Sequence, residues 1–86
     1  MILVEKISVN IKIVSLNVEH NFLIPRDMSV LDATELAVRT LREEYPGVKD
    51  SALGYMLLHA SSGKVLTNGC SLKQLGIVQG EKLLLI

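Results

Sequence analysis

Apolar and polar residues alternate in two stretches near the start of the chain. The apolar and aromatic positions, with one histidine among them, are Ile7, Val9, Ile11 and Ile13, then Val18, His20, Phe22 and Ile24. A period of two is typical of a strand with one buried face. We therefore predict a hairpin that turns at Leu16 and Asn17 and ends at Pro25, whose nitrogen cannot donate to a ladder. The predicted cross-strand pairs are Ile13 with His20, Ile11 with Phe22, and Val9 with Ile24.

A helical period follows the hairpin. Ser29 is a suitable N-cap, because its hydroxyl can accept from a free backbone N–H and Asp32 places an acid in the first turn. The apolar stripe predicted to face the core is Val30, Ala33, Ala37, Leu41 and Tyr45. Pro46 and Gly47 end the predicted helix.

The second half of the chain contains shorter apolar runs between turn residues. We predict a crossing loop over 48–53, strands over 55–60, 64–66 and 82–86, and one helical turn over 72–75 that ends at Gly76. A helix stripe must be buried against a sheet face, so we expect a two-layer α+β domain over residues 1–86. The first and last strands can be central neighbours only if they are parallel.

Composition narrows the possible functions. Nine basic residues balance nine acidic ones, so no net charge favours nucleic acid or an anionic membrane. The single cysteine, Cys70, cannot form an internal disulfide and suits a reducing compartment. No apolar run has the length of a membrane span, and the start of the chain lacks the order of a signal peptide. These features predict a cytoplasmic protein that does not insert into a membrane.

The segment over residues 67–85 resembles the C-terminal half of ubiquitin-like proteins. A glycine turn is followed by Leu72, Leu75, Ile77 and the paired strand leucines Leu83 and Leu85. The resemblance implies a ubiquitin-like β-grasp fold, with a mixed sheet of four to five strands packed on one long helix. More narrowly, the chain resembles the YukD-like proteins of bacterial type VII secretion systems. The two features that it shares with them are the ending Leu-x-x-x-Gly-Ile-x-x-Gly-x-x-Leu and the absence of a Gly-Gly pair.

The sequence offers little catalytic chemistry. Conjugating and sulfur-carrying relatives need a flexible Gly-Gly end, whereas this sequence ends in a predicted strand at the β-branched Ile86. Cys70 follows a turn without a nearby cation, and one cysteine cannot hold an iron–sulfur cluster. His20 and His59 lack partners at metal-ligand spacing. We therefore expect no enzyme activity, no cofactor and no metal site.

Surplus apolar residues on the predicted strands indicate a contact surface. Lys82 cannot be buried unpaired, so strand alternation turns Leu84 and Ile86 outward with it. The third strand adds either Met56 and Leu58 or Tyr55 and Leu57 to this outer face. The residues that we predict to bind a protein, partly by their resemblance to the recognition face of ubiquitin-like proteins, are Leu23, Leu58, Lys82, Leu84 and Ile86. The alternative is that residues 1–4, a homodimer mate or another domain covers this face.

Three functions remain open at this point. The first is a non-enzymatic ubiquitin-like interaction module, by resemblance an accessory of a type VII secretion system that binds a system component or itself. The second is a modifier or sulfur carrier whose C-terminal tail is missing from the sequence. The third is a regulatory domain, of the ubiquitin-like or Ras-association type, from a larger protein. The codons that follow Ile86 in the gene distinguish them.

Overall fold

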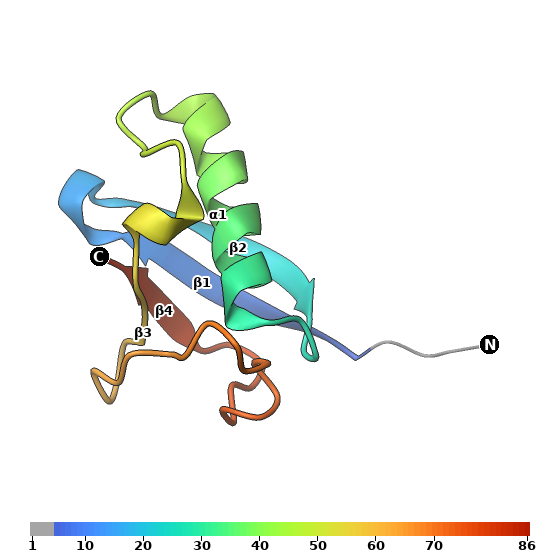
Figure 1. Cartoon of the computed structure of the whole chain (residues 1–86). Coiled ribbons are helices and arrows are strands. Elements are labelled where there is room, and N and C mark those ends of the chain that lie inside the picture. The colour runs from blue at the N-terminus through green and yellow to red at the C-terminus, as the bar shows by residue number, and fades with distance from the viewer. Residues whose placement is uncertain (1–4) are drawn as a thin grey trace.

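A computed structural model describes residues 5–86 as one helix packed on a four-stranded mixed sheet (Figure 1). The strands are β1 (Lys6–Ile13), β2 (Val18–Pro25), β3 (Leu57–His59) and β4 (Lys82–Leu85), and the helix is α1 (Val30–Glu44). Two short 3₁₀ helices, η1 (Val14–Leu16) and η2 (Ala52–Gly54), lie in the connections. The strand order is β2-β1-β4-β3, with β1 and β4 parallel at the centre. The predicted α+β class and the central parallel pair are confirmed.

The hairpin forms as predicted, but its predicted register is wrong by two residues. Ile13 pairs with Val18, Ile11 with His20, Val9 with Phe22 and Ile7 with Ile24. The reason is the turn, because η1 and Asn17 occupy four positions and Asn17 closes them in the left-handed conformation, with φ of 53°. A shift of two leaves every side chain on its predicted face, since strands have a period of two.

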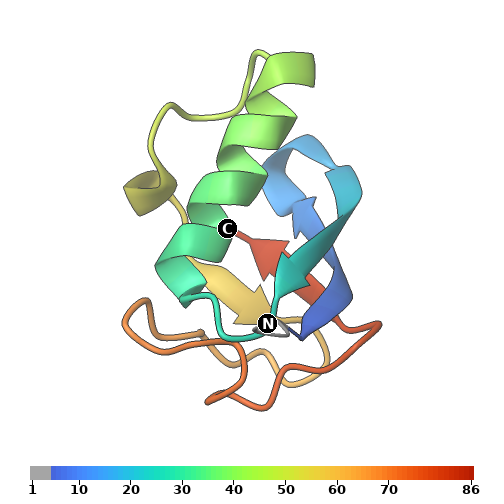
Figure 2. The same ribbon diagram turned by 90° about the vertical axis from the view of Figure 1, so that its right-hand side faces the viewer.

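Helix α1 begins where the sequence predicts. The Ser29 hydroxyl accepts a hydrogen bond from the backbone N–H of Asp32 at 3.1 Å. Figure 2 shows the helix lying across one face of the sheet. The stripe is buried as far as Leu41, but Tyr45 is exposed, because the helix ends at Glu44 and the chain becomes extended at Tyr45. Thr34 and Val38 widen the buried stripe.

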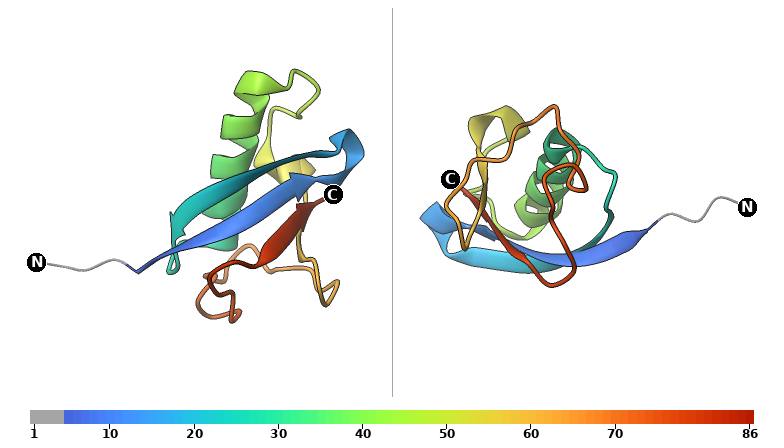
Figure 3. Two further views of the ribbon diagram at one scale, coloured as in Figure 1. Left: turned by 180° about the vertical axis from the view of Figure 1, so that it is seen from behind. Right: turned by 90° about the horizontal axis from the view of Figure 1, so that it is seen from below.

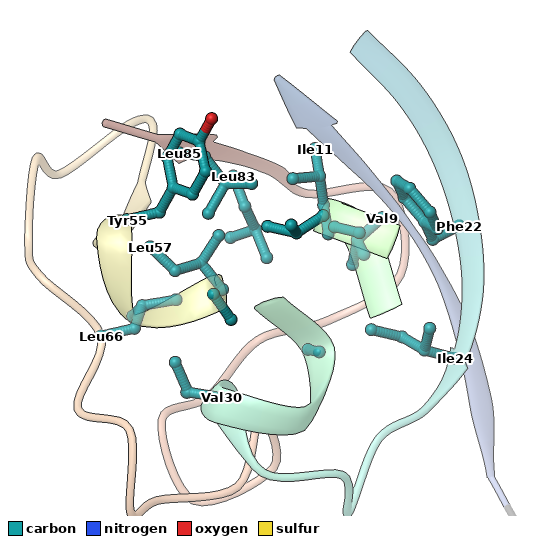
Figure 4. Packing of buried hydrophobic residues seen from close by; sticks show 14 of the residues in the cluster. Val9, Ile11, Phe22, Ile24, Val30, Tyr55, Leu57, Leu66, Leu83 and Leu85 are labelled. Atoms are coloured by element: carbon teal, nitrogen blue, oxygen red, sulfur yellow. The ribbon is translucent and has the colours of Figure 1, made fainter. Parts of the chain in front are cut away.

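The inner face of the sheet and the helix stripe form the core (Figure 4). Leu83 and Leu85 on β4 are fully buried, between Ile11 and Ile13 of β1 and the residues of β3. The apolar run at the end of the sequence is therefore part of the core, as predicted. Each such leucine or isoleucine contributes about 1.5–3 kcal/mol through burial.

The segment over 60–81 contains less regular structure than the sequence predicts. β3 covers only Leu57–His59, and the predicted strand over 64–66 is reduced to an isolated bridge between Val65 and Leu58. Gly63 donates to the carbonyl of His59 within the turn, and the returning chain then makes backbone bonds to β3 from His59 to Lys64 and from Leu66 to Leu57. The rest winds below the sheet as linked turns (Figure 3). Among the described residues the sheet therefore has four strands.

Candidate protein-interaction site

The outer face of the sheet, opposite the helix, carries the residues that the sequence predicts to bind a partner. On β4, Lys82 is exposed, Leu84 is half-buried and Ile86, just beyond the strand, is 47% exposed. Leu83 and Leu85 between them are fully buried. The predicted parity of this strand is confirmed.

Strand β3 continues the apolar surface beside β4. Leu58 lies opposite Leu84, and Met56 exchanges two backbone hydrogen bonds with Ile86, at 2.9 and 3.0 Å. Met56 is 50% exposed, whereas Tyr55 and Leu57 are buried. Of the two alternatives for the third strand, the outward pair is therefore Met56 and Leu58.

The sequence analysis missed Val14, which is 46% exposed at the start of η1. Its predecessor Ile13 lies opposite Leu85 in the last pair of the parallel ladder, so Val14 and Ile86 are the residues that follow the ends of β1 and β4. The alternation of β1, continued by one residue, is the signal that places Val14 outward. We refer to the set Val14, Met56, Leu58, Leu84 and Ile86 as the apolar patch.

Leu23 lies apart from the apolar patch. It is 68% exposed on β2, and its partner across the hairpin is Ser8 on β1. Leu84 instead lies beside Lys12, two alternations further along β1. Asn10 and Lys12, both on the outer face, separate Leu23 from the patch, so the structure groups only three of the four predicted apolar contact residues.

Lys82 marks one boundary of the patch. Its Nζ lies 3.4 Å from Glu19 Oε2 on β2, and both side chains are about half exposed. Beneath this pair, Asn10 Nδ2 donates to Asn21 Oδ1 at 3.0 Å. The charge of Lys82 is therefore matched within the chain. Lys12, which lies beside Leu84 on β1, adds a second cation to this side of the patch.

A histidine and a glutamate meet where β3 ends and β4 begins, on the same side of the strands as the buried Leu57 and Leu83. His59 Nε2 lies 2.7 Å from Glu81 Oε1, and Glu81 Oε2 accepts from the backbone N–H of Val78 at 3.1 Å. Burial opposes ionisation of Glu81, but the hydrogen bonds from His59 and Val78, with the charge of His59, outweigh it and lower the pKa of Glu81. His59 Nδ1 is 2.9 Å from Ser62 Oγ, so one ring nitrogen holds the turn after β3 and the other links β3 to the residue before β4.

Other candidate chemistry is not assembled in residues 5–86. Cys70 is half-buried in the turn before Ser71, where its carbonyl accepts from the backbone N–H of Val30 at 2.8 Å. Within these residues, no cluster of three or more histidine, cysteine, aspartate or glutamate side chains could hold a metal ion. No helix in the described part of the chain is long and apolar enough to cross a membrane.

Solved structures share this arrangement. The N-terminal ubiquitin-like domain of the 4931431F19Rik protein superposes with a TM-score of 0.74 at 21% identity, over 94% of this chain and 73% of that one. The ubiquitin-like domain of Plasmodium falciparum Dsk2 gives 0.71 at 20% identity, over 95% and 100%. A protein designed on the template of human erythrocytic ubiquitin gives 0.72 at 22%, over 92% and 87%. No family model and no curated protein matches the sequence.

These likenesses establish the fold. The chain has the ubiquitin-like β-grasp fold, in which a mixed sheet holds one helix. The wider resemblance drawn from residues 67–85 is thereby confirmed.

Proposed function

We propose that the chain is a non-enzymatic protein-interaction module that binds its partner through the apolar patch. The observation that carries this proposal is that segments 56–58 and 84–86 lie side by side with Met56, Leu58, Leu84 and Ile86 on the outer face, and that the exposed Val14 follows the end of the neighbouring β1. Contiguous exposed apolar residues with a polar margin are typical of contact surfaces.

The composition of the patch indicates how it would bind. Its side chains are aliphatic or, at Met56, a flexible thioether that adapts to a partner's shape. Lys82 is already paired with Glu19, so a partner that covers Lys82 need not strip an unmatched charge of water. The driving force would therefore be apolar burial, at about 25 cal/mol per Å².

A surface role suits Ile86 better than a covalent one. Its backbone N–H and carbonyl both bond to Met56, which holds this residue in the sheet. Carrying a group on this segment would require those bonds to open. We therefore propose that residues 82–86 serve recognition and not conjugation or sulfur transfer.

The narrower proposal is that the partner is a component of a bacterial type VII secretion system in the cytoplasm. Its support is the resemblance of residues 72–83 to YukD-like proteins in the spacing of Leu72, Gly76, Ile77, Gly80 and Leu83. Genes for secretion components beside the gene for this chain would support the proposal, and a host without such a system would contradict it.

A second candidate is a ubiquitin-like regulatory domain of a longer protein. Two of the solved structures similar to this chain are described as ubiquitin-like domains, one of them N-terminal. The gene sequence on both sides of codons 1–86 tests this candidate, because an open reading frame that continues would favour it.

The test of the interaction surface compares two aspartate substitutions. Immobilised wild type, Leu84→Asp and Val78→Asp are incubated with lysate of the native host, and the captured proteins are quantified by mass spectrometry. Val78 is a matched control, since it is an apolar side chain 48% exposed outside the sheet. We expect a protein that wild type and Val78→Asp retain and Leu84→Asp loses, and direct titration of that protein then gives the affinity. Equal capture by all three would contradict the proposal.

A further inference from the structure

Strand β2 is an edge of the sheet, on the side away from the apolar patch. It spans eight residues, Val18–Pro25, and pairs only with β1. In the part of the chain that the structure describes, no other segment pairs with its outer side. An edge strand of this length presents backbone donors and acceptors to whatever strand meets it.

The directions of the backbone groups follow from the bonds of β1. Asn10 donates its N–H to Glu81, and the carbonyl of Ser8 accepts from Gly80, so the even-numbered residues of β1 face β4. The odd-numbered residues therefore face β2 and bond to its even-numbered residues, from 18 to 24. The N–H and carbonyl groups of Glu19, Asn21 and Leu23 consequently point away from the sheet.

This edge lacks most of the features that prevent strands from pairing. Natural edges are commonly interrupted by lysine, proline or a bulge. The register of β2 with β1 runs without a bulge from Val18 to Pro25, and the only proline is its last residue. Glu19 is the single charged side chain on the strand, and Lys82 holds its carboxylate over the outer face.

The positions of the free groups suit a second copy of the same strand. Asn21 lies midway between Glu19 and Leu23. A two-fold axis at Asn21 therefore gives each outward backbone N–H and carbonyl of these three residues a partner on the second copy, in an antiparallel ladder. Asn21 then pairs with Asn21 of the second copy, and Glu19 with Leu23. Each N–H on this edge finds a carbonyl.

The side chains are compatible with the same register. On the inner face, His20 meets Phe22 of the second copy and Val18 meets Ile24. His20 is exposed and its ring already lies edge-on to Phe22 of its own chain, with ring centroids 5.1 Å apart. Aromatic and β-branched cross-strand pairs stabilise a ladder, and this register places no two like charges opposite each other.

From the free edge and its two-fold match, we propose that the chain forms an antiparallel homodimer through β2, which joins two four-stranded sheets into one of eight strands. The axis is perpendicular to the sheet, so both outer faces lie on the same side. The two apolar patches are then roughly 24 Å or more apart, which is about five strand spacings. The dimer would present the patch twice, which favours a partner with two binding sites.

Substitution of Asn21 by a charged residue tests whether the two-fold axis of the dimer passes through this position. Its side chain lies on the outer face, and Asn21→Lys opposes two ammonium groups across the axis, whereas Asn21→Asp opposes two carboxylates. We expect sedimentation equilibrium to show a homodimer for wild type and at least a ten-fold higher dissociation constant for each variant alone. An equimolar mixture of the two variants should recover dimer, because lysine then faces aspartate. Circular dichroism checks that both variants fold.

Two further measurements separate this dimer from the alternatives. Leu84→Asp should leave it intact, because the substitution lies two strands from β2. Amide exchange at Glu19, Asn21 and Leu23 should slow with rising protein concentration, while exchange at His20 and Phe22 should not. A wild type that remains monomeric at millimolar concentration overturns the proposal. A dimer that Leu84→Asp dissociates, or protection of Asn21 that is independent of concentration, overturns it as well.

Discussion

The two halves of the outer sheet face differ, although the inner face of the same four strands is mostly apolar and forms one core. On the β4–β3 half, Leu84 and Leu58 lie opposite each other, and Met56 and Ile86 extend them. On the β1–β2 half, Ser8, Asn10 and Lys12 face outward beside Glu19 and Asn21, and the exposed Leu23 stands apart among these polar residues. The core requires apolar residues only on the inner face, so the leucines on one outer half are not needed for folding. This contrast is the strongest indication that the apolar half has a function of its own.

The largest expected effect is a difference in stability between substitutions at adjacent residues of β4, which lie on the inner and on the outer face. Leu83→Asp, and likewise Leu85→Asp, should unfold the domain, because an unpaired buried carboxylate costs several kcal/mol of a total stability of about 5–15 kcal/mol. Leu84→Asp should stay folded. Circular dichroism and urea unfolding of the variants measure this difference. If Leu84→Asp unfolds while Leu83→Asp is tolerated, the assignment of the two faces is reversed.

A smaller effect is expected at the helix that supports both halves of the sheet. Ser29→Ala removes the hydroxyl that caps α1 and should lower the free energy of unfolding by about 0.5–2 kcal/mol. Binding at the patch should be unchanged as long as the protein is folded, because the cap is remote from the outer face. Loss of binding by a fully folded Ser29→Ala variant would mean that the helix participates in recognition.

A pH-dependent effect is expected where β3 ends and β4 begins, at the pair of His59 and Glu81. The pKa of Glu81 is lowered from its usual 4.5, so the ionised carboxylate stabilises the fold above that pH, and the stabilisation is lost as the pH falls through the folded-state value. Wild type should therefore be more stable than Glu81→Gln at pH 6, and the difference should shrink toward pH 3. Urea titrations across this range measure it, with the exposed Glu35→Gln as control. A difference that grows on acidification would contradict the assignment.

The smallest effect is expected at the boundary between the halves. Lys82→Met removes the ion pair with Glu19, which is half exposed on both sides and contributes about 0.2–1 kcal/mol at most. The loss should diminish in 1 M salt, which screens the wild-type pair. Thermal unfolding of wild type and Lys82→Met at two salt concentrations measures it. A larger, salt-independent loss would show that Lys82 supports the sheet and does not only delimit the patch.

Much of the fold could be predicted because its signals are local. Alternation in β1, the Ser29 cap and the parity of Lys82 each depend on neighbours in the sequence, and each is predicted correctly. In β2 the predicted alternation holds at Phe22 and Ile24, whereas His20 is exposed near the open edge of the sheet. The hairpin register is not predicted correctly, because it depends on the left-handed conformation of Asn17, which a strand pattern does not encode. The separation of Leu23 from the patch depends on the pairing of three strands, which no single stretch of sequence specifies.

The central pair of β1 and β4 also has a consequence for how quickly the chain folds. Asn10 and Lys82 are partners about 70 positions apart, so closing the sheet must wait for a large loss of chain entropy. The hairpin and α1 consist of local contacts and can form first. Until β4 inserts, the inner side of β1 and one of its edges stay open to other chains. Folding should therefore be slower than that of a helical bundle of equal length, and most vulnerable to aggregation just before its last strand is in place.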